Sequence, residues 1–137
     1  MPRIHIYSRA DWRMPLSRRE LATCLKRMLA ALPEDMPRPA GIDLHCLRDG
    51  DMAPNNAIYM GCPGPTNVLS FPGGEDMPGT LLFSVDTLYR ESLLYGQSPR
   101  GHAVRLLAHG VGHLSGLDHG PAMDAVCALM EAAAVAH

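Results

Sequence analysis

Three histidines in the C-terminal third of the sequence have the spacing of metal ligands. His109 and His113 are four residues apart, so on a helix they lie about 40° apart around the axis and one turn along it. Gly116 follows where this helix should end, and a glycine there can adopt the left-handed conformation that turns the chain back toward His119. The spacing therefore predicts one Zn²⁺ ion held by His109, His113 and His119.

Three nitrogen ligands leave one coordination position open, as in catalytic zinc sites, whereas structural sites usually close with four protein ligands. The open position could take water or a phosphate oxygen, so the metal could generate a nucleophile or act as a Lewis acid. Other first-row divalent ions would also suit three imidazoles. Asp118 either orients a ligand histidine or accepts backbone N–H groups in the turn. His102, seven residues before His109, is expected to have a core or surface role.

The histidine spacing equals that of the H-E-x-x-H-x-x-G-x-x-H zinc proteases. In those enzymes the glutamate after the first histidine is the general base. Gly110 occupies that position here, and a glycine cannot accept a proton. Peptidase chemistry by that mechanism is therefore disfavoured, even if the metal binds.

Three segments resemble one protein family. Residues 109–119, HGVGHLSGLDH, resemble the HGxLHLxGYDH signature of the YbeY family of endoribonucleases, which are rRNA maturation factors. Residues 65–72, PTNVLSFP, resemble the family's PTDVLSFP, and Asn56 with Tyr59 resembles the weaker NxxYR motif. With its motifs the resemblance covers roughly residues 55–131.

The resemblance implies a zinc-dependent endoribonuclease that cleaves single-stranded RNA in 16S rRNA maturation and ribosome quality control. Its partners would then be rRNA and the small ribosomal subunit. Three positions depart from the family pattern: the Arg after the tyrosine is Met60, the Asp of PTD is Asn67, and the Asp that opens the next strand is Thr80. Because these departures remove charged groups, an assembly factor with a zinc site and weak or lost catalysis is the alternative.

Side chains near the third predicted strand could complete the site. Ser70 and Thr66 could donate hydrogen bonds to a phosphate, although satisfying the edge of the strand would account for them equally well. Asn67 and Arg105 join them as candidate RNA-binding residues, with ordinary solvent exposure as the alternative for Arg105. Ser70 and Asp118 are the candidate catalytic residues.

Hydrophobic periodicity predicts the elements that must position these residues. Ser17 and Glu20 form a capping box at the start of the first helix, and Ser98-Pro99 opens the helix that carries the histidines. Early strands and late helices favour an α+β fold: a single domain over 1–137, with a small mixed four-stranded sheet, four to five helices and a metal helix like that of the zinc proteases. The pattern predicts strands at 3–8, 41–47, 66–71 and 80–84, helices at about 17–32, 85–95, 98–116 and from 121 onward, and an ambiguous segment, with a short helix as one interpretation, at 51–60.

Composition narrows the class of protein further. No apolar run approaches the roughly 20 residues that span a bilayer, so no membrane segment is expected. The N-terminal residues lack the apolar stretch of a secretory signal, and a cytoplasmic location follows by default.

The cysteines form no C-x-x-C pair and are expected to be buried free thiols. They are Cys24, Cys46, Cys62 and Cys127. The oligomeric state is left open.

Charge is distributed unevenly along the chain. The net charge is −2, but residues 1–48 carry +4 and residues 49–137 carry −6. Four basic residues would form a stripe on the first helix, which could meet phosphates or could be an ordinary solvated face. These residues are Arg18, Arg19, Lys26 and Arg27.

Overall fold

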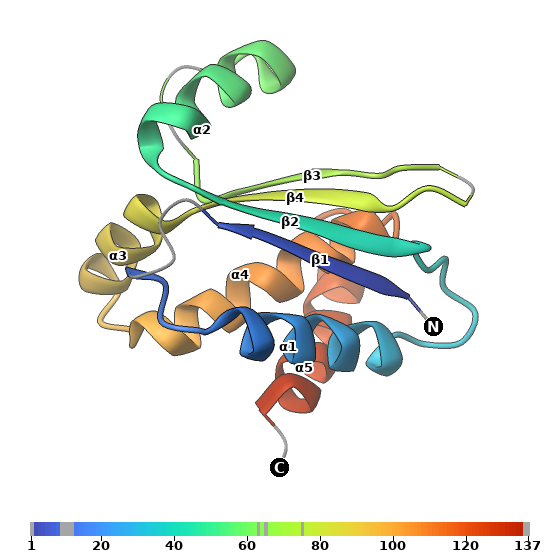
Figure 1. The fold of residues 1–137 in the computed structure, drawn as a ribbon. Helices are drawn as coiled ribbons and strands as arrows, with labels where there is room; N and C mark the ends of the chain where they lie inside the picture. Colours follow the sequence, from blue (N-terminus) through green and yellow to red (C-terminus); the bar gives the residue numbers. More distant parts are fainter. Residues whose placement is uncertain (1, 9–12, 63, 65, 75, 136–137) are drawn as a thin grey trace.

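A four-stranded sheet with most of its helices on one face forms the body of the protein (Figure 1). The computed structural model describes residues 2–8, 13–62, 64, 66–74 and 76–135. Its elements are β1 (Arg3–Ser8), α1 (Arg18–Ala31), β2 (Gly41–Leu47), α2 (Asp49–Asn55), the π-helical turn η2 (Asn56–Met60), β3 (Val68–Phe71), β4 (Gly79–Ser84), α3 (Val85–Leu94), α4 (Pro99–Leu114) and α5 (Pro121–Val135).

The sheet is mixed and has the strand order β1-β2-β4-β3. β1, β2 and β4 are parallel, because α1 crosses over between β1 and β2, and α2, η2 and β3 intervene between β2 and β4. β3 pairs antiparallel with β4, which follows it in the chain. The predicted α+β fold with a small mixed four-stranded sheet and about five helices is therefore confirmed.

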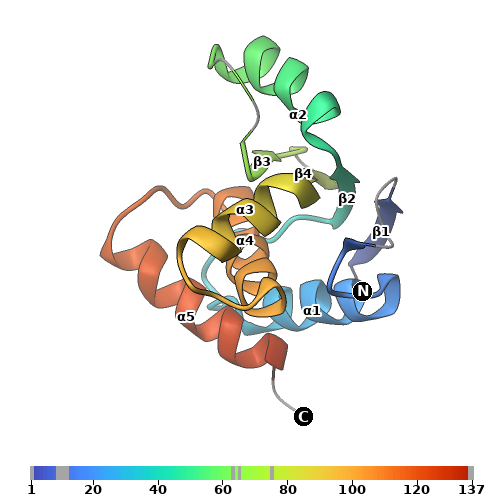
Figure 2. The same cartoon turned by 90° about the vertical axis from the view of Figure 1, so that its left-hand side faces the viewer.

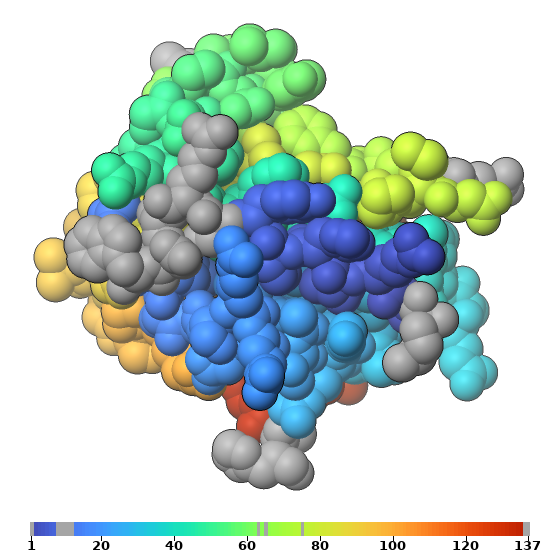
Figure 3. All heavy atoms as spheres, in the orientation of Figure 1, coloured from blue at the N-terminus to red at the C-terminus, as the bar shows by residue number. Residues whose placement is uncertain are grey.

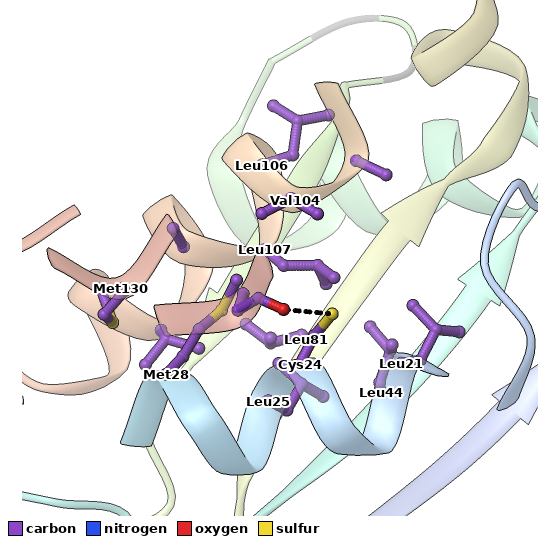
Figure 4. Packing of buried hydrophobic residues seen from close by; sticks show 14 of the residues in the cluster. Leu21, Cys24, Leu25, Met28, Leu44, Leu81, Val104, Leu106, Leu107 and Met130 are labelled. Atoms are coloured by element: carbon purple, nitrogen blue, oxygen red, sulfur yellow. Dashed lines mark hydrogen bonds between the residues drawn. The ribbon is translucent and has the colours of Figure 1, made fainter. Parts of the chain in front are cut away.

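Helix α4 lies in the middle of the molecule, with the sheet above it and α1, α3 and α5 around it (Figure 2). Side chains from α1, α4, α5 and the sheet meet in one hydrophobic cluster (Figure 4). Leu25, Leu44 and Leu107 in this cluster are fully buried. Burial of one such side chain contributes about 1.5–3 kcal/mol, so the core fixes the position of α4 firmly.

Local sequence signals set the element boundaries closely. The capping box is present: the Glu20 backbone N–H donates to Ser17 Oγ at 3.1 Å, and the Ser17 backbone N–H donates to Glu20 Oε1 at 3.0 Å. The strand predicted to begin at Thr66 instead begins at Val68, which pairs with Phe83 of β4. Just before it, Asn67 Oδ1 accepts the Val68 N–H at 2.6 Å, and the Asn67 carbonyl accepts the Ser84 N–H at 2.8 Å. Thr66 therefore lies outside the sheet.

The ambiguous segment at 51–60 is helical throughout but changes type. Helix α2 contains Pro54, which has no N–H to donate and whose ring crowds the carbonyl one turn earlier. The chain then widens into the π-helical turn η2 and ends at Gly61, which has a φ of 67°. α2 and η2 form a lobe that projects from the sheet (Figure 3), and Ile58, Tyr59 and Met60 on it are exposed.

The four cysteines are unpaired, and three of them are buried as predicted. The prediction is wrong for Cys62, which is exposed just after η2. Among the described residues, no helix is both long enough and apolar enough to cross a membrane.

Candidate metal centre

The end of α4 is built to reverse the chain. The Leu117 N–H donates to the Gly112 carbonyl at 3.0 Å, and the Gly116 N–H donates to the His113 carbonyl at 3.0 Å. Gly116 has a φ of 89°, so these bonds form the left-handed helix ending that glycine favours. The predicted glycine bend is therefore present, and it carries the following loop back beside the helix.

This bend brings His113 and His119 together. Their ring centroids are 5.2 Å apart and their planes lie at 78° to each other. Zn–N bonds of about 2.0–2.1 Å place an imidazole centroid about 3.2 Å from the ion, so two rings on a tetrahedral ion have centroids about 5.2 Å apart. The spacing of the pair therefore fits two ligands of one zinc ion.

The ring of His113 is also held in a defined orientation. Its Nδ1 lies 2.9 Å from the carbonyl oxygen of Leu117, to which an Nδ1–H donates. That hydrogen bond leaves Nε2 with a free lone pair, which is the usual arrangement of a metal-binding histidine. The carbonyl is available only because the glycine bend returns Leu117 to the end of the helix.

His109 lies one turn earlier and is half-buried. Burial lowers its pKa, and the carboxylates of Glu131 and Asp124 only partly oppose that effect. A neutral imidazole is the form that binds metal. His109 Nδ1 faces α5, where the Cys127 sulfur lies 3.9 Å away.

Within the described parts of the chain, no three His, Cys, Asp or Glu side chains stand in an arrangement that could hold a metal ion. The paired rings of His113 and His119 thus lack a third ligand as the side chains stand. Residues four apart on a helix have Cβ atoms about 5–6 Å apart, so the backbone already places His109 beside His113.

The glycines within the histidine motif allow close packing. A Cβ on Gly110 would lie 2.9 Å from Leu81 Cδ2, so this position faces the sheet. A Cβ on Gly112 would lie 2.7 Å from the Met123 sulfur in α5. A glutamate at position 110 would consequently point into the core, which adds a geometric reason against the protease mechanism.

Ser70 on β3 lies against α4. Its Oγ donates to the Gly110 carbonyl at 3.2 Å, so it connects β3 to α4. Thr66 is half-buried before β3, and the exposed Arg105 lies 3.9 Å from Glu131. Asp118 is exposed in the loop that ends at His119, and its candidate catalytic role stays a prediction, like the RNA contacts of the others.

Sequence reasoning missed a polar network beside β3. Asn67 Nδ2 donates to the two Glu91 oxygens at 3.1 and 3.3 Å, and His102 Nε2 lies 3.0 Å from Glu91 Oε1. The network joins the chain before β3 to α3 and α4, and His102 within it is buried. No local pattern marks Glu91, because its partners come from other elements.

The fold and the site together define the class: an α+β domain whose central helix ends in a glycine bend with a cluster of histidines. The family model described as endoribonuclease YbeY matches residues 6–134, and the chain belongs to the YbeY family, as its motifs predict.

Relatives and a solved structure agree with this assignment. The chain is 39% identical to an endoribonuclease YbeY of Oleidesulfovibrio alaskensis, over 80% of this chain and 78% of the relative. It is also 39% identical to one of Lawsonia intracellularis, over 85% and 84%. A solution structure of a Thermotoga maritima protein matches with a TM-score of 0.62 and 17% identity, covering 98% of this chain and 89% of that one. This last likeness supports the fold alone.

Proposed function

We propose that this protein is a zinc-dependent endoribonuclease that cleaves single-stranded RNA. The observation that carries the proposal is the 5.2 Å spacing of the His113 and His119 rings at the end of α4. The family supplies the reaction class, since the relatives are described as endoribonucleases. The proposed biological role is 16S rRNA maturation and quality control on the small ribosomal subunit, in the cytoplasm.

The proposed ligands are His109, His113 and His119. When bound, Zn²⁺ would supply a Lewis acid that offsets negative charge developing on the phosphate. The hydrogen bond from His113 to the Leu117 carbonyl orients one ligand before the metal binds. Less free energy is then needed to order the site when the metal binds. Asp118, next to His119 and exposed, is the proposed group that holds or accepts a proton.

Metal analysis with matched histidine variants tests the proposal. His113→Ala is expected to abolish stoichiometric zinc binding and cleavage of single-stranded RNA together. His5→Ala is the control for zinc binding, because His5 lies exposed on β1. Duplex RNA and casein, each with and without a chelator, define the substrate. A His113→Ala variant that keeps one zinc per chain at wild-type affinity would overturn the ligand assignment, and chelator-sensitive casein cleavage would support a peptidase instead.

A ribosome-assembly factor with weak or lost catalysis is the second candidate, and Met60 favours it. This residue replaces the family arginine, and its side chain is 58% exposed on the projecting lobe, where an arginine could reach a phosphate. Met60→Arg is therefore expected to raise RNA cleavage if the missing cation limits the rate. If neither the wild type nor the Met60→Arg variant cleaves RNA, and both co-sediment with small ribosomal subunits, the assembly factor is favoured.

A further inference from the structure

A pocket of about 460 Å³ lies on the face of the sheet that α1, α4 and α5 leave open (Figure 1). Leu44 of β2, paired with Ile6 and Leu81, belongs to the side-chain row that packs against the helices. Side chains alternate between the two faces of a strand, so the adjacent row, with His5 beside Asp43, points to the open face. The pocket and the candidate metal centre at the end of α4 therefore lie on opposite sides of the sheet.

Three aromatic rings form a row at this pocket. The ring of Tyr7 lies 4.6 Å from the ring of His45, its neighbour on β2, with 12° between the planes. The ring of His5, two residues before Tyr7 on β1, lies 6.4 Å from the Tyr7 ring at 16°. His5 and Tyr7 line the pocket, and both are exposed. Because the three planes are nearly parallel, a flat ring can add to this row by stacking.

The pocket also has a polar lining that lacks partners of its own. It consists of Arg3 at the start of β1, Asp43 on β2 and Asp76 in the connection between β3 and β4. Within the described part of the chain, none of these three side chains makes a hydrogen bond or an ion pair. Asp43 pairs directly with His5 on the neighbouring strand, about 4.8 Å away, so its half-buried carboxylate stands beside the aromatic row.

We propose that this pocket binds a guanine base of single-stranded RNA, an inference that deepens the proposed function and rests on it. The base stacks on the aromatic row, its N1–H and N2–H groups donate to the Asp43 carboxylate, and Arg3 contacts a neighbouring phosphate. Guanine is the RNA base that offers two adjacent N–H donors on its Watson–Crick edge. Adenine and cytosine place a ring-nitrogen acceptor beside their amino group, and uracil flanks its one N–H with two carbonyls, so each of them would face the carboxylate with an acceptor.

The charges of the lining define how the strand is held. Two carboxylates and one guanidinium leave a net charge of −1, so affinity comes from stacking and from donors on the base and not from many phosphate contacts. The binding constant should therefore depend only weakly on salt, with at most about one phosphate contact. An arginine of a basic protein could also stack on the rings and pair with Asp43, but Arg3 in the same lining would repel it. The volume fits a base and its sugar, within the roughly 300–1,000 Å³ of small-ligand sites.

A base-substitution series tests the assignment without relying on cleavage. The probes are short fluorescent 2′-O-methyl oligouridylates that carry one central guanine, inosine or adenine, and the protein is free of metal. The wild type should bind the guanine probe about fivefold or more tighter than the adenine probe, with inosine, which lacks the N2 amino group, between them. Asp43→Asn should reduce this ratio to less than about twofold. Because the Asp43 side chain has no partner in the described chain, the substitution should leave the fold intact. Asp35→Asn, in the exposed loop before β2, is the matched control and should keep the preference.

Stacking is tested with a second pair of variants. Tyr7→Leu should weaken binding of all three probes by about fivefold or more, because it removes one aromatic face from the row. Tyr95→Leu is the control, since Tyr95 is 60% exposed just after α3 and lies outside the pocket lining, and it should change binding by less than about twofold.

Several results would overturn the proposal. They are equal binding of the guanine and adenine probes by the wild type, a guanine preference that Asp43→Asn keeps, and equal weakening by Tyr7→Leu and Tyr95→Leu. GMP bound as tightly as the guanine probe would identify a free nucleotide as the ligand, and an arginine-rich peptide that displaces the probe would identify a protein partner. His113→Ala should leave probe binding unchanged. A guanine preference in a protein that cleaves no RNA when loaded with zinc would support the pocket and refute only the proposed cleavage.

Discussion

The family departure at Asn67 is compensated within this chain, and reversing it should destabilise the protein. In the wild type the Asn67 amide donates to the Glu91 carboxylate, which also contacts His102. Asn67→Asp would restore the residue of the family motif but remove this donor and place two carboxylates in contact. The acceptor for the Val68 N–H would be kept, so only the side facing Glu91 changes.

The size of the effect follows from the contacts. A hydrogen bond to a charged group contributes about 1.5–3 kcal/mol, and two like charges about 4 Å apart repel by about 4 kcal/mol at an effective dielectric constant of about 20. The Glu91 side chain is 20% exposed, and both carboxylates can rotate apart, which reduces the repulsion. We therefore expect Asn67→Asp to lower the free energy of unfolding by about 2–4 kcal/mol near pH 8.

Urea unfolding of four proteins measures this coupling. They are the wild type, Asn67→Asp, Glu91→Gln and the double variant, which exchanges the amide and the carboxylate between the two positions. The double variant should regain much of the stability that Asn67→Asp loses. Protonating one carboxyl restores a donor, so the loss in Asn67→Asp should grow as the pH rises from about 4 to 8.

Two results would refute this reasoning. One is an Asn67→Asp variant as stable as the wild type at pH 8. The other is a double variant no more stable than Asn67→Asp alone, because the exchanged pair should then form the same hydrogen bond in reverse.

Three further predictions concern the core, the capping box and the β3 tether. Leu107→Ala should lower the free energy of unfolding, measured in urea, by about 2–5 kcal/mol. Leu93→Ala, at a site 87% exposed, should change it by no more than about 0.5 kcal/mol, and equal losses in the two variants would contradict the assigned core. Hydrogen bonding with Arg100 lowers the pKa of Glu20 to about 2, so the stability from this carboxylate is present above pH 4.5 and lost as the pH falls toward 2. NMR titration should show that value, and Arg100→Gln should raise it; an unchanged value would exclude the ion pair. Ser70→Ala should lower the free energy of unfolding by about 1 kcal/mol and leave the zinc stoichiometry unchanged. Loss of zinc in this variant would show that Ser70 does more than hold β3 to α4.

Much of the fold was predictable because its signals are local. The strand at 3–8, the capping box at Ser17 and the helix start at Ser98 depend on residues within one or two turns of each other. The start of β3 was predicted two residues too early, because hydrophobic alternation does not show where pairing with β4 begins. The exposure of Cys62 likewise depends on what packs above it.

The sequence alone determined the family, through its three motifs. It also determined the candidate histidine ligands and the glycine bend, because these residues lie within eleven positions of one another and are related by the geometry of a single helix ending. Tertiary structure decided the contacts between elements distant in the chain. These contacts place His109 Nδ1 beside Cys127, join Ser70 to the backbone of α4, and pair Asn67 with Glu91. Such contacts depend on which faces of the helices and the sheet meet in the packed core, and periodicity indicates that a face is apolar without specifying its partner.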